Sequence, residues 1–128
     1  MKLRVRHNSV RFRLGQSEVE ALNRSGECRE AILFPGGAKL EYVLLASGSG
    51  NGQIRASFSD GVVAVTVPRD QVVSWHGSDQ VGITADIDLE QGRKLRILIE
   101  KDFRCIDERP DEDQSDTFAN PLGALSCS

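Results

Sequence analysis

Hydrophobic and polar residues alternate along most of the chain with the period of two that half-buried strands show. Near the start, Leu3 and Val5 alternate with cations, and the alternation resumes after a turn at residues 7–9. The dipeptide Asp60-Gly61 separates two later segments of this kind and is typical of a type I′ hairpin turn. The pattern predicts about eight, mostly antiparallel strands: near 2–6, 10–14, 27–34, 38–46, 54–58, 63–67, 80–88 and 94–101.

Two short segments carry helix signals instead. Ser17 with Glu20 three residues later forms a capping box, in which each side chain bonds to the other residue's backbone N–H. Gly26 follows as a stop signal, and Pro68 is a residue that often opens a helix. We predict helices at about 17–25 and 68–76.

The order strand-strand-helix-strand-strand occurs twice, and the two halves align by residue type. Residues 10–14 match 63–67 and 17–22 match 70–75 at an offset of 53, and 39–45 match 94–100 at an offset of 55. A meander of short strands also gives such matches, which is the simpler reading. Taken as a repeat, the pattern indicates an internal duplication with half-repeats at 1–47 and 53–102.

These elements predict one α+β domain at residues 1–106. The strands would form a curved sheet or partial barrel that the two short helices cover. Residues 107–128 differ, because their first half is acidic and has no hydrophobic period, which is typical of an unfolded segment. We therefore expect an acidic C-terminal tail that lies on the domain or extends from it.

The charge of the chain is unevenly distributed. The 128 residues have a formal net charge of −3, but residues 1–16 carry a net +5 and residues 102–128 a net −5. The five N-terminal cations alternate with apolar residues, so they share one strand face. This predicted anion-binding face consists of Lys2, Arg4, Arg6, Arg11 and Arg13.

The partner that best fits this face is the chain's own acidic tail or another protein. Cations on one face also suit the phosphates of a nucleic acid or other polyanion. A surface that binds single strands usually adds aromatic side chains for base stacking, but Phe12 falls on the opposite face. The sequence pI near 5.4 argues against nucleic acid as well.

Several other classes receive no support. No apolar run approaches the roughly 18 residues needed to cross a bilayer, and the N-terminus lacks the apolar region of a secretory signal. The three cysteines lack CxxC spacing, so neither a zinc ribbon nor a disulfide framework is indicated and a cytoplasmic location is expected.

The sequence predicts no catalytic residue, cofactor or metal ligand. The acids of the tail do not match a calcium loop, and the glycines after Ser47 lack the lysine of a phosphate loop. Neither histidine belongs to a recognisable triad. A cluster of Cys28, Cys105 and His76 in space stays open, although nothing in their spacing favours it.

One group of polar residues follows the second predicted helix. Trp75, His76, Asp79 and Gln80 form a candidate rim for a small ligand. The structural alternative is that Asp79 caps a turn and that the others pack. If the rim exists, Glu100 would face the same pocket, and the protein would be a small enzyme rather than a non-enzymatic interaction or ligand-binding module.

Three strings carry a resemblance that spans most of the chain: Ser78–Ile83 (SDQVGI), Leu98–Cys105 (LIEKDFRC) and Glu112–Asp116 (EDQSD). With the segments Lys2–Arg6 and Gln16–Val19, they resemble a family of small, uncharacterised bacterial proteins to which no activity is attached. The resemblance implies a bacterial, cytoplasmic, single-domain protein, and it supplies no catalytic residue.

Overall fold

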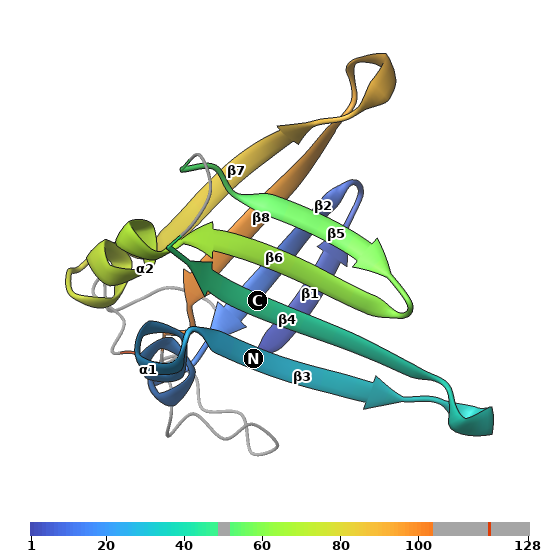
Figure 1. Cartoon of the computed structure of the whole chain (residues 1–128), viewed down its shortest axis with the longest axis horizontal. Helices are drawn as coiled ribbons and strands as arrows, with labels where there is room; N and C mark the ends of the chain where they lie inside the picture. The colour runs from blue at the N-terminus through green and yellow to red at the C-terminus, as the bar shows by residue number, and fades with distance from the viewer. Residues whose placement is uncertain (49–51, 104–117, 119–128) are drawn as a thin grey trace.

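The computed structural model describes residues 1–48, 52–103 and 118 (Figure 1). They contain eight strands and two helices. The strands are β1 (Lys2–Arg6), β2 (Ser9–Leu14), β3 (Glu27–Leu33), β4 (Lys39–Ser47), β5 (Arg55–Ser59), β6 (Val62–Pro68), β7 (Gly82–Asp88) and β8 (Lys94–Lys101). The helices are α1 (Gln16–Ser25) and α2 (Arg69–His76), and single 3₁₀ turns lie at Pro35–Gly37 and Glu90–Gly92. The predicted tail lies outside the described residues, apart from Phe118.

The strands form two four-stranded mixed sheets, in the orders β1-β2-β8-β7 and β3-β4-β6-β5. In each sheet the outer pairs are antiparallel hairpins, whereas the central pair, β2 with β8 or β4 with β6, is parallel. Each sheet therefore joins one hairpin from each half of the chain. The prediction of an α+β fold with eight strands and two helices is confirmed, and the two sheets do not close into a barrel.

The two halves repeat not only the order of elements but also their register. Lys2 faces Arg13 in the first hairpin, and the residues 53 positions later, Arg55 and Thr66, face each other in the third. After the helices the offset is 55, because the pairing of β3 with β4 recurs in β7 with β8. These are the offsets of the sequence alignment, so the repeated order is confirmed. The division into a domain and a tail at residue 106 stays a prediction.

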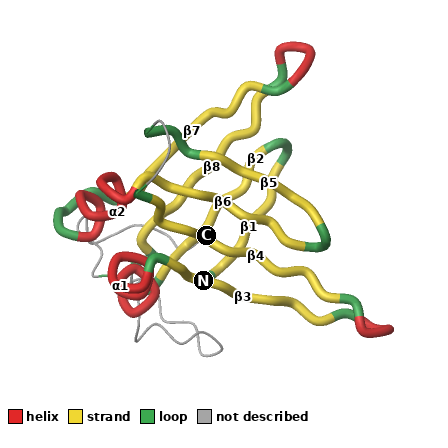
Figure 2. Tube along the Cα trace, viewed as in Figure 1, coloured by secondary structure: helices red, strands yellow, loops and turns green. Residues whose placement is uncertain are grey.

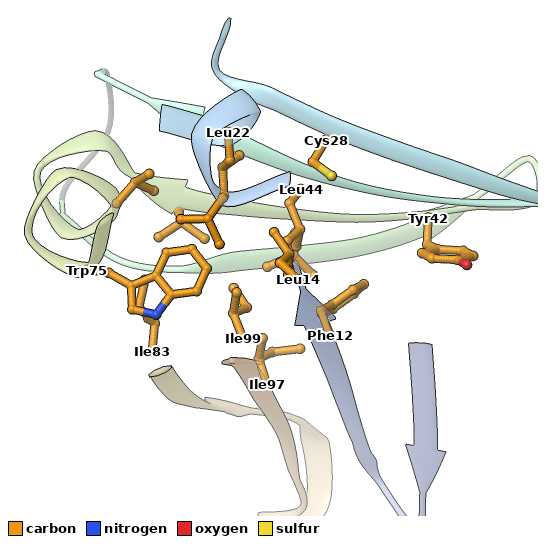
Figure 3. Close-up of a cluster of buried hydrophobic side chains, with 14 residues drawn as sticks. Phe12, Leu14, Leu22, Cys28, Tyr42, Leu44, Trp75, Ile83, Ile97 and Ile99 are labelled. Carbon is orange, nitrogen blue, oxygen red and sulfur yellow. The ribbon is translucent and has the colours of Figure 1, made fainter. Parts of the chain in front are cut away.

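The hydrophobic core lies between the sheets and under the helices. Both helices lie at one end of the molecule and the four hairpin turns at the other (Figure 2). α1 buries Val19 and Leu22, and α2 buries the corresponding Val72 and Trp75. Side chains from both sheets meet them (Figure 3), the largest being Phe12, Leu14, Leu44, Ile97 and Ile99. Burying each such side chain contributes roughly 1.5–3 kcal/mol, so packing between the sheets is the main source of stability.

The hairpin turns explain two details of the sequence. Asp60 and Gly61 both have positive φ, 52° and 75°, as the predicted type I′ turn requires. A Cβ atom on Gly61 would lie only 2.8 Å from the carbonyl oxygen of Lys39. At the corresponding turn, Asn8 instead donates a side-chain hydrogen bond of 2.8 Å to the carbonyl oxygen of Lys94. Glycine is therefore required at one turn and replaced by a bonded side chain at the other.

Candidate functional site: a basic face on one sheet

The N-terminal cations lie on the outer face of the β1-β2-β8-β7 sheet. In the antiparallel pair β1–β2, Arg4 faces Arg11 and Lys2 faces Arg13, so their side chains lie on the same side of the sheet. The parallel neighbour β8 adds Arg96, which pairs with Ser9 next to Arg6. We call this surface the basic face; it consists of Lys2, Arg4, Arg6, Arg11, Arg13 and Arg96.

A shallow hollow lies in the middle of the basic face. It measures about 90 Å³ and is lined by Arg4, Arg6, Ser9, Arg11 and Leu98. One water molecule needs roughly 10–15 Å³ of such a cavity volume. The hollow is therefore large enough for a group of several heavy atoms. Three guanidinium groups around one depression give planar forks of N–H donors that match carboxylate or phosphate oxygens.

The cations of the basic face differ in whether they already have an anionic partner. Lys2 Nζ lies 3.0 Å from Asp102, and Glu100 lies 3.3 Å from Nε of Arg11 and 3.8 Å from Nε of Arg13. Among the described residues, Arg4, Arg6 and Arg96 form no ion pair. The unpaired charge is therefore concentrated on β1, at the edge of the sheet.

The far side of the same sheet face has the opposite sign. On β7, Asp86 faces Arg96 and Asp88 faces Lys94, and both carboxylates are exposed. Lys94 Nζ lies 3.8 Å from Asp88, whereas no ion pair of Asp86 occurs among the residues that the structure describes. The outer face thus changes from cationic at β1 to anionic at β7 within four strands.

The end of β8 connects the basic face to Phe103 and Phe118, which lie on either side of the acidic segment 107–116 in the sequence. Phe118 donates its backbone N–H to the carbonyl oxygen of Asp102 at 2.6 Å, and its ring packs edge-on against Phe103 with the centroids 5.8 Å apart. Lys101 Nζ lies 5.3 Å from the centroid of the Phe118 ring. Residues 103 and 118 therefore lie beside Asp102, the residue that pairs with Lys2.

The four residues of the predicted ligand rim have separate structural contacts. Trp75 is fully buried and donates its indole N–H to the carbonyl oxygen of Val81 at 3.0 Å. His76 Nε2 lies 2.6 Å from a carboxylate oxygen of Glu20 on α1. Asp79 and Gln80 are exposed, and the Gln80 side-chain amide donates to the carbonyl oxygen of Gly82 at the start of β7. Trp75 thus belongs to the core, and ligand binding at this rim stays a prediction.

Three other titratable side chains among the described residues, those of Cys28, Lys101 and Glu20, are also buried or hydrogen-bonded within the fold. Burial raises the pKa of the Cys28 thiol to about 11, so it stays protonated and is a poor nucleophile at neutral pH. Burial likewise lowers the pKa of Lys101, whose ammonium donates to the carbonyl oxygen of Ser78 at 2.8 Å. The hydrogen bond from His76 holds the pKa of Glu20 below its usual value. Glu100, once a candidate for a pocket near the rim, lies on the outer face with Arg11.

No three metal-binding side chains gather anywhere in the part of the chain that the structure describes. Cys105, one member of the cysteine–histidine cluster that the sequence left open, lies outside that part. In the same described ranges, no helix has the length and apolar composition needed to cross a bilayer.

The sequence alone did not identify Arg96 or the hollow. Both depend on the parallel pairing of β2 with β8, which joins residues more than 80 positions apart. The positions of Lys94, Arg96 and Glu100 do indicate a polar face on this strand, but they do not show which strand lies beside it.

Fold and site together define a small α+β protein with a duplicated ββαββ order and one basic sheet face. The chain belongs to the family of unknown function DUF7009, which it matches over residues 1–122. No curated protein matches the chain, and no solved structure does either.

Proposed function

We propose that the protein is a non-enzymatic binding module whose basic face binds an acidic segment of a protein. The hollow between Arg4, Arg6 and Arg11 carries this proposal, because two of its three guanidinium groups have no ion pair with the described residues. A guanidinium group binds a carboxylate with two parallel hydrogen bonds, which gives such a contact direction as well as charge.

The chain's own acidic segment at 107–116 competes for this face in our proposal. Its sequence contains six carboxylates, and the residues next to it in the described structure, Phe103 and Phe118, lie beside Asp102 and therefore near Lys2. A tethered competitor acts at a high effective concentration, so it would favour partners with a stronger or longer acidic segment.

We also infer a bacterial, cytoplasmic protein. The sequence resemblance and the three cysteines without a pairing pattern support this location.

The experiment measures the fluorescence anisotropy of a labelled peptide with the sequence of residues 107–116. The protein variant carries amides in place of the acids in its own segment, so that self-competition is removed. We expect this variant to bind the peptide roughly tenfold more tightly than the natural chain, and high salt should weaken both. Equal affinities would exclude competition by the tail.

A second pair of variants tests the basic face itself. Arg4→Gln/Arg6→Gln removes the two unpaired cations and should weaken peptide binding about tenfold. The control, Arg55→Gln/Arg93→Gln, removes two exposed cations elsewhere and should have little effect. The proposal is wrong if both pairs act alike, or if single-stranded DNA binds the basic face more tightly than the acidic peptide does.

A further inference from the structure

The free edge of β7 borders an open cleft. The cleft has a volume of about 550 Å³ and is lined on one side by residues 84–88 of β7. Gln53 and Ile54, which lead into β5, and Gln71 of α2 form the other side. In Figure 1, β7 is the outermost strand of its sheet, next to the segment that enters β5.

The backbone of β7 has unused hydrogen-bonding groups at this edge. Val81 and Leu89, on either side of the strand, bond to Lys101 and Arg93 across the hairpin. Because the bonded positions alternate in an antiparallel pair, the odd-numbered residues of β7 bond to β8 and the even-numbered ones face outward.

These outward groups are those of Gly82, Thr84, Asp86 and Asp88. The carbonyl oxygen of Gly82 accepts a bond from the Gln80 side chain at 2.9 Å. Among the described residues, no hydrogen bond reaches the backbone of the other three, which line the cleft. Three alternate residues thus offer N–H and C=O groups with the spacing of a strand.

The place in the first half that corresponds to the cleft is filled instead. There Met1 holds the position that Ile54 has in the second half, and its backbone nitrogen bonds to Glu18 of α1 and to Glu30 of β3. Tyr42 donates its hydroxyl to the Met1 carbonyl oxygen at 3.3 Å. The residues that correspond to Glu18 and Glu30 are Gln71 and Ala85, and both line the open cleft.

We propose that this cleft binds an extended, cationic peptide of a partner protein, which pairs with the free edge of β7 as an additional strand. Backbone bonds to Thr84, Asp86 and Asp88 supply the pairing, as in other cases of strand addition. The volume of the cleft falls in the range of roughly 300–1,000 Å³ that is usual for ligand sites.

The charge of the side chains at the cleft determines which kind of peptide strand can pair with β7. The outward side chains at the cleft include the exposed carboxylates of Asp86 and Asp88, and no lysine or arginine lines it. A strand with Lys or Arg at alternate positions places a cation opposite each carboxylate. A second copy that offered its own β7 would bring like charges together, which disfavours that pairing.

The probe is a blocked, fluorescently labelled peptide of alternating lysine and valine, titrated into the full-length protein. We expect Asp86→Asn/Asp88→Asn to weaken binding by about two- to tenfold, as the loss of two surface ion pairs implies. The matched control, Asp60→Asn/Glu90→Gln, removes two exposed carboxylates at hairpin turns and should bind normally. Arg4→Gln/Arg6→Gln should also bind normally, which separates this site from the basic face.

Two measurements distinguish strand pairing from simple charge attraction. A peptide methylated at every backbone nitrogen keeps its charges but cannot donate to β7, so it should not bind. In hydrogen exchange, saturating peptide should slow the amides of Thr84, Asp86 and Asp88 about tenfold. Equal binding of the methylated peptide, or unchanged exchange at these amides, overturns the proposal. So does self-association that Asp86→Lys changes, since it would assign the edge to a second copy.

Discussion

The two halves of the molecule have the same buried positions but different surfaces. Leu22 and Trp75 occupy corresponding sites on the two helices, and both are fully buried. On the outer faces the likeness ends, because Arg4 and Arg6 of β1 correspond to Ser57 and Ser59 of β5. Packing therefore fixes the repeated framework, and the exposed positions of each half were free to acquire different chemistry.

The space beside β3 and the corresponding space beside β7 show the same difference. Met1 with Glu18 and Glu30 closes the first half, whereas the equivalent place in the second half is a cleft. A symmetric framework thus carries two unlike surfaces, one cationic and one with an open cleft beside a strand edge. The predictions below test how far the correspondence between the halves extends, beginning with the largest effect.

Truncation of the two corresponding core residues should be the most damaging change. Trp75→Ala should lower the free energy of unfolding by about 3–5 kcal/mol and Leu22→Ala by about 2–5 kcal/mol. The tryptophan change should cost more, because it removes the larger side chain and also one of the two hydrogen bonds that the Val81 carbonyl oxygen accepts. Equilibrium unfolding in urea measures both. Val73→Ala, at a position that is 51% exposed, is the control, and a Trp75→Ala variant as stable as that control would contradict the packing described here.

The two hairpin turns should respond differently to alanine. Gly61→Ala should destabilise the protein by roughly 1–3 kcal/mol, because the residue has positive φ and its Cβ would meet the Lys39 carbonyl oxygen. Asn8→Ala loses only one side-chain hydrogen bond, which is worth about 0.5–1.5 kcal/mol. Thermal unfolding of the two variants should rank them in this order, and the reverse order would contradict the close approach of Gly61 to the Lys39 carbonyl oxygen.

The smallest effect concerns Cys28, whose counterpart in the second half is the buried Ile83. Burial raises the Cys28 pKa from 9.0 to about 11, so the folded state holds the thiol proton more tightly than the unfolded state. Stability should therefore be unaffected below about pH 9 and should fall as the pH rises toward 11. Cys28→Val should show a smaller fall over that range in unfolding experiments. Identical alkaline curves would mean that the thiol is not buried from water.

Much of the fold could be predicted from local patterns. Alternation gave the strands to within about two residues, because one face of each sheet is buried and the other is exposed. Gly26 and Pro68 marked one end of each helix, but the predicted capping box of Ser17 and Glu20 was wrong, because α1 begins at Gln16 and is capped by Gly15 with Glu18. The pairing of β2 with β8 and of β4 with β6 could not be predicted, since it depends on contacts between distant segments that leave no local period.

The candidate sites divide in the same way. The five N-terminal cations lie on one face because alternation alone determines it, whereas Arg96 joins them only through the parallel pairing. Trp75, a member of the candidate ligand rim, is fully buried, and its spacing from Val72 equals that of Leu22 from Val19. A spacing of three residues on a helix places both side chains on the same face. The sequence therefore contained a signal for the burial of Trp75. No local sequence pattern indicates the cleft at β7, because segments from different parts of the chain form it.

The exchange of hairpins between the halves has a consequence for how the chain folds. β2 pairs with a strand that begins more than 80 residues later, so the first sheet has a high contact order. During synthesis, the β1–β2 hairpin must wait for β8 with Phe12 and Leu14 still lacking their partners from that strand. We therefore expect slow folding, and a nascent chain that depends on chaperones until its last strand has been made.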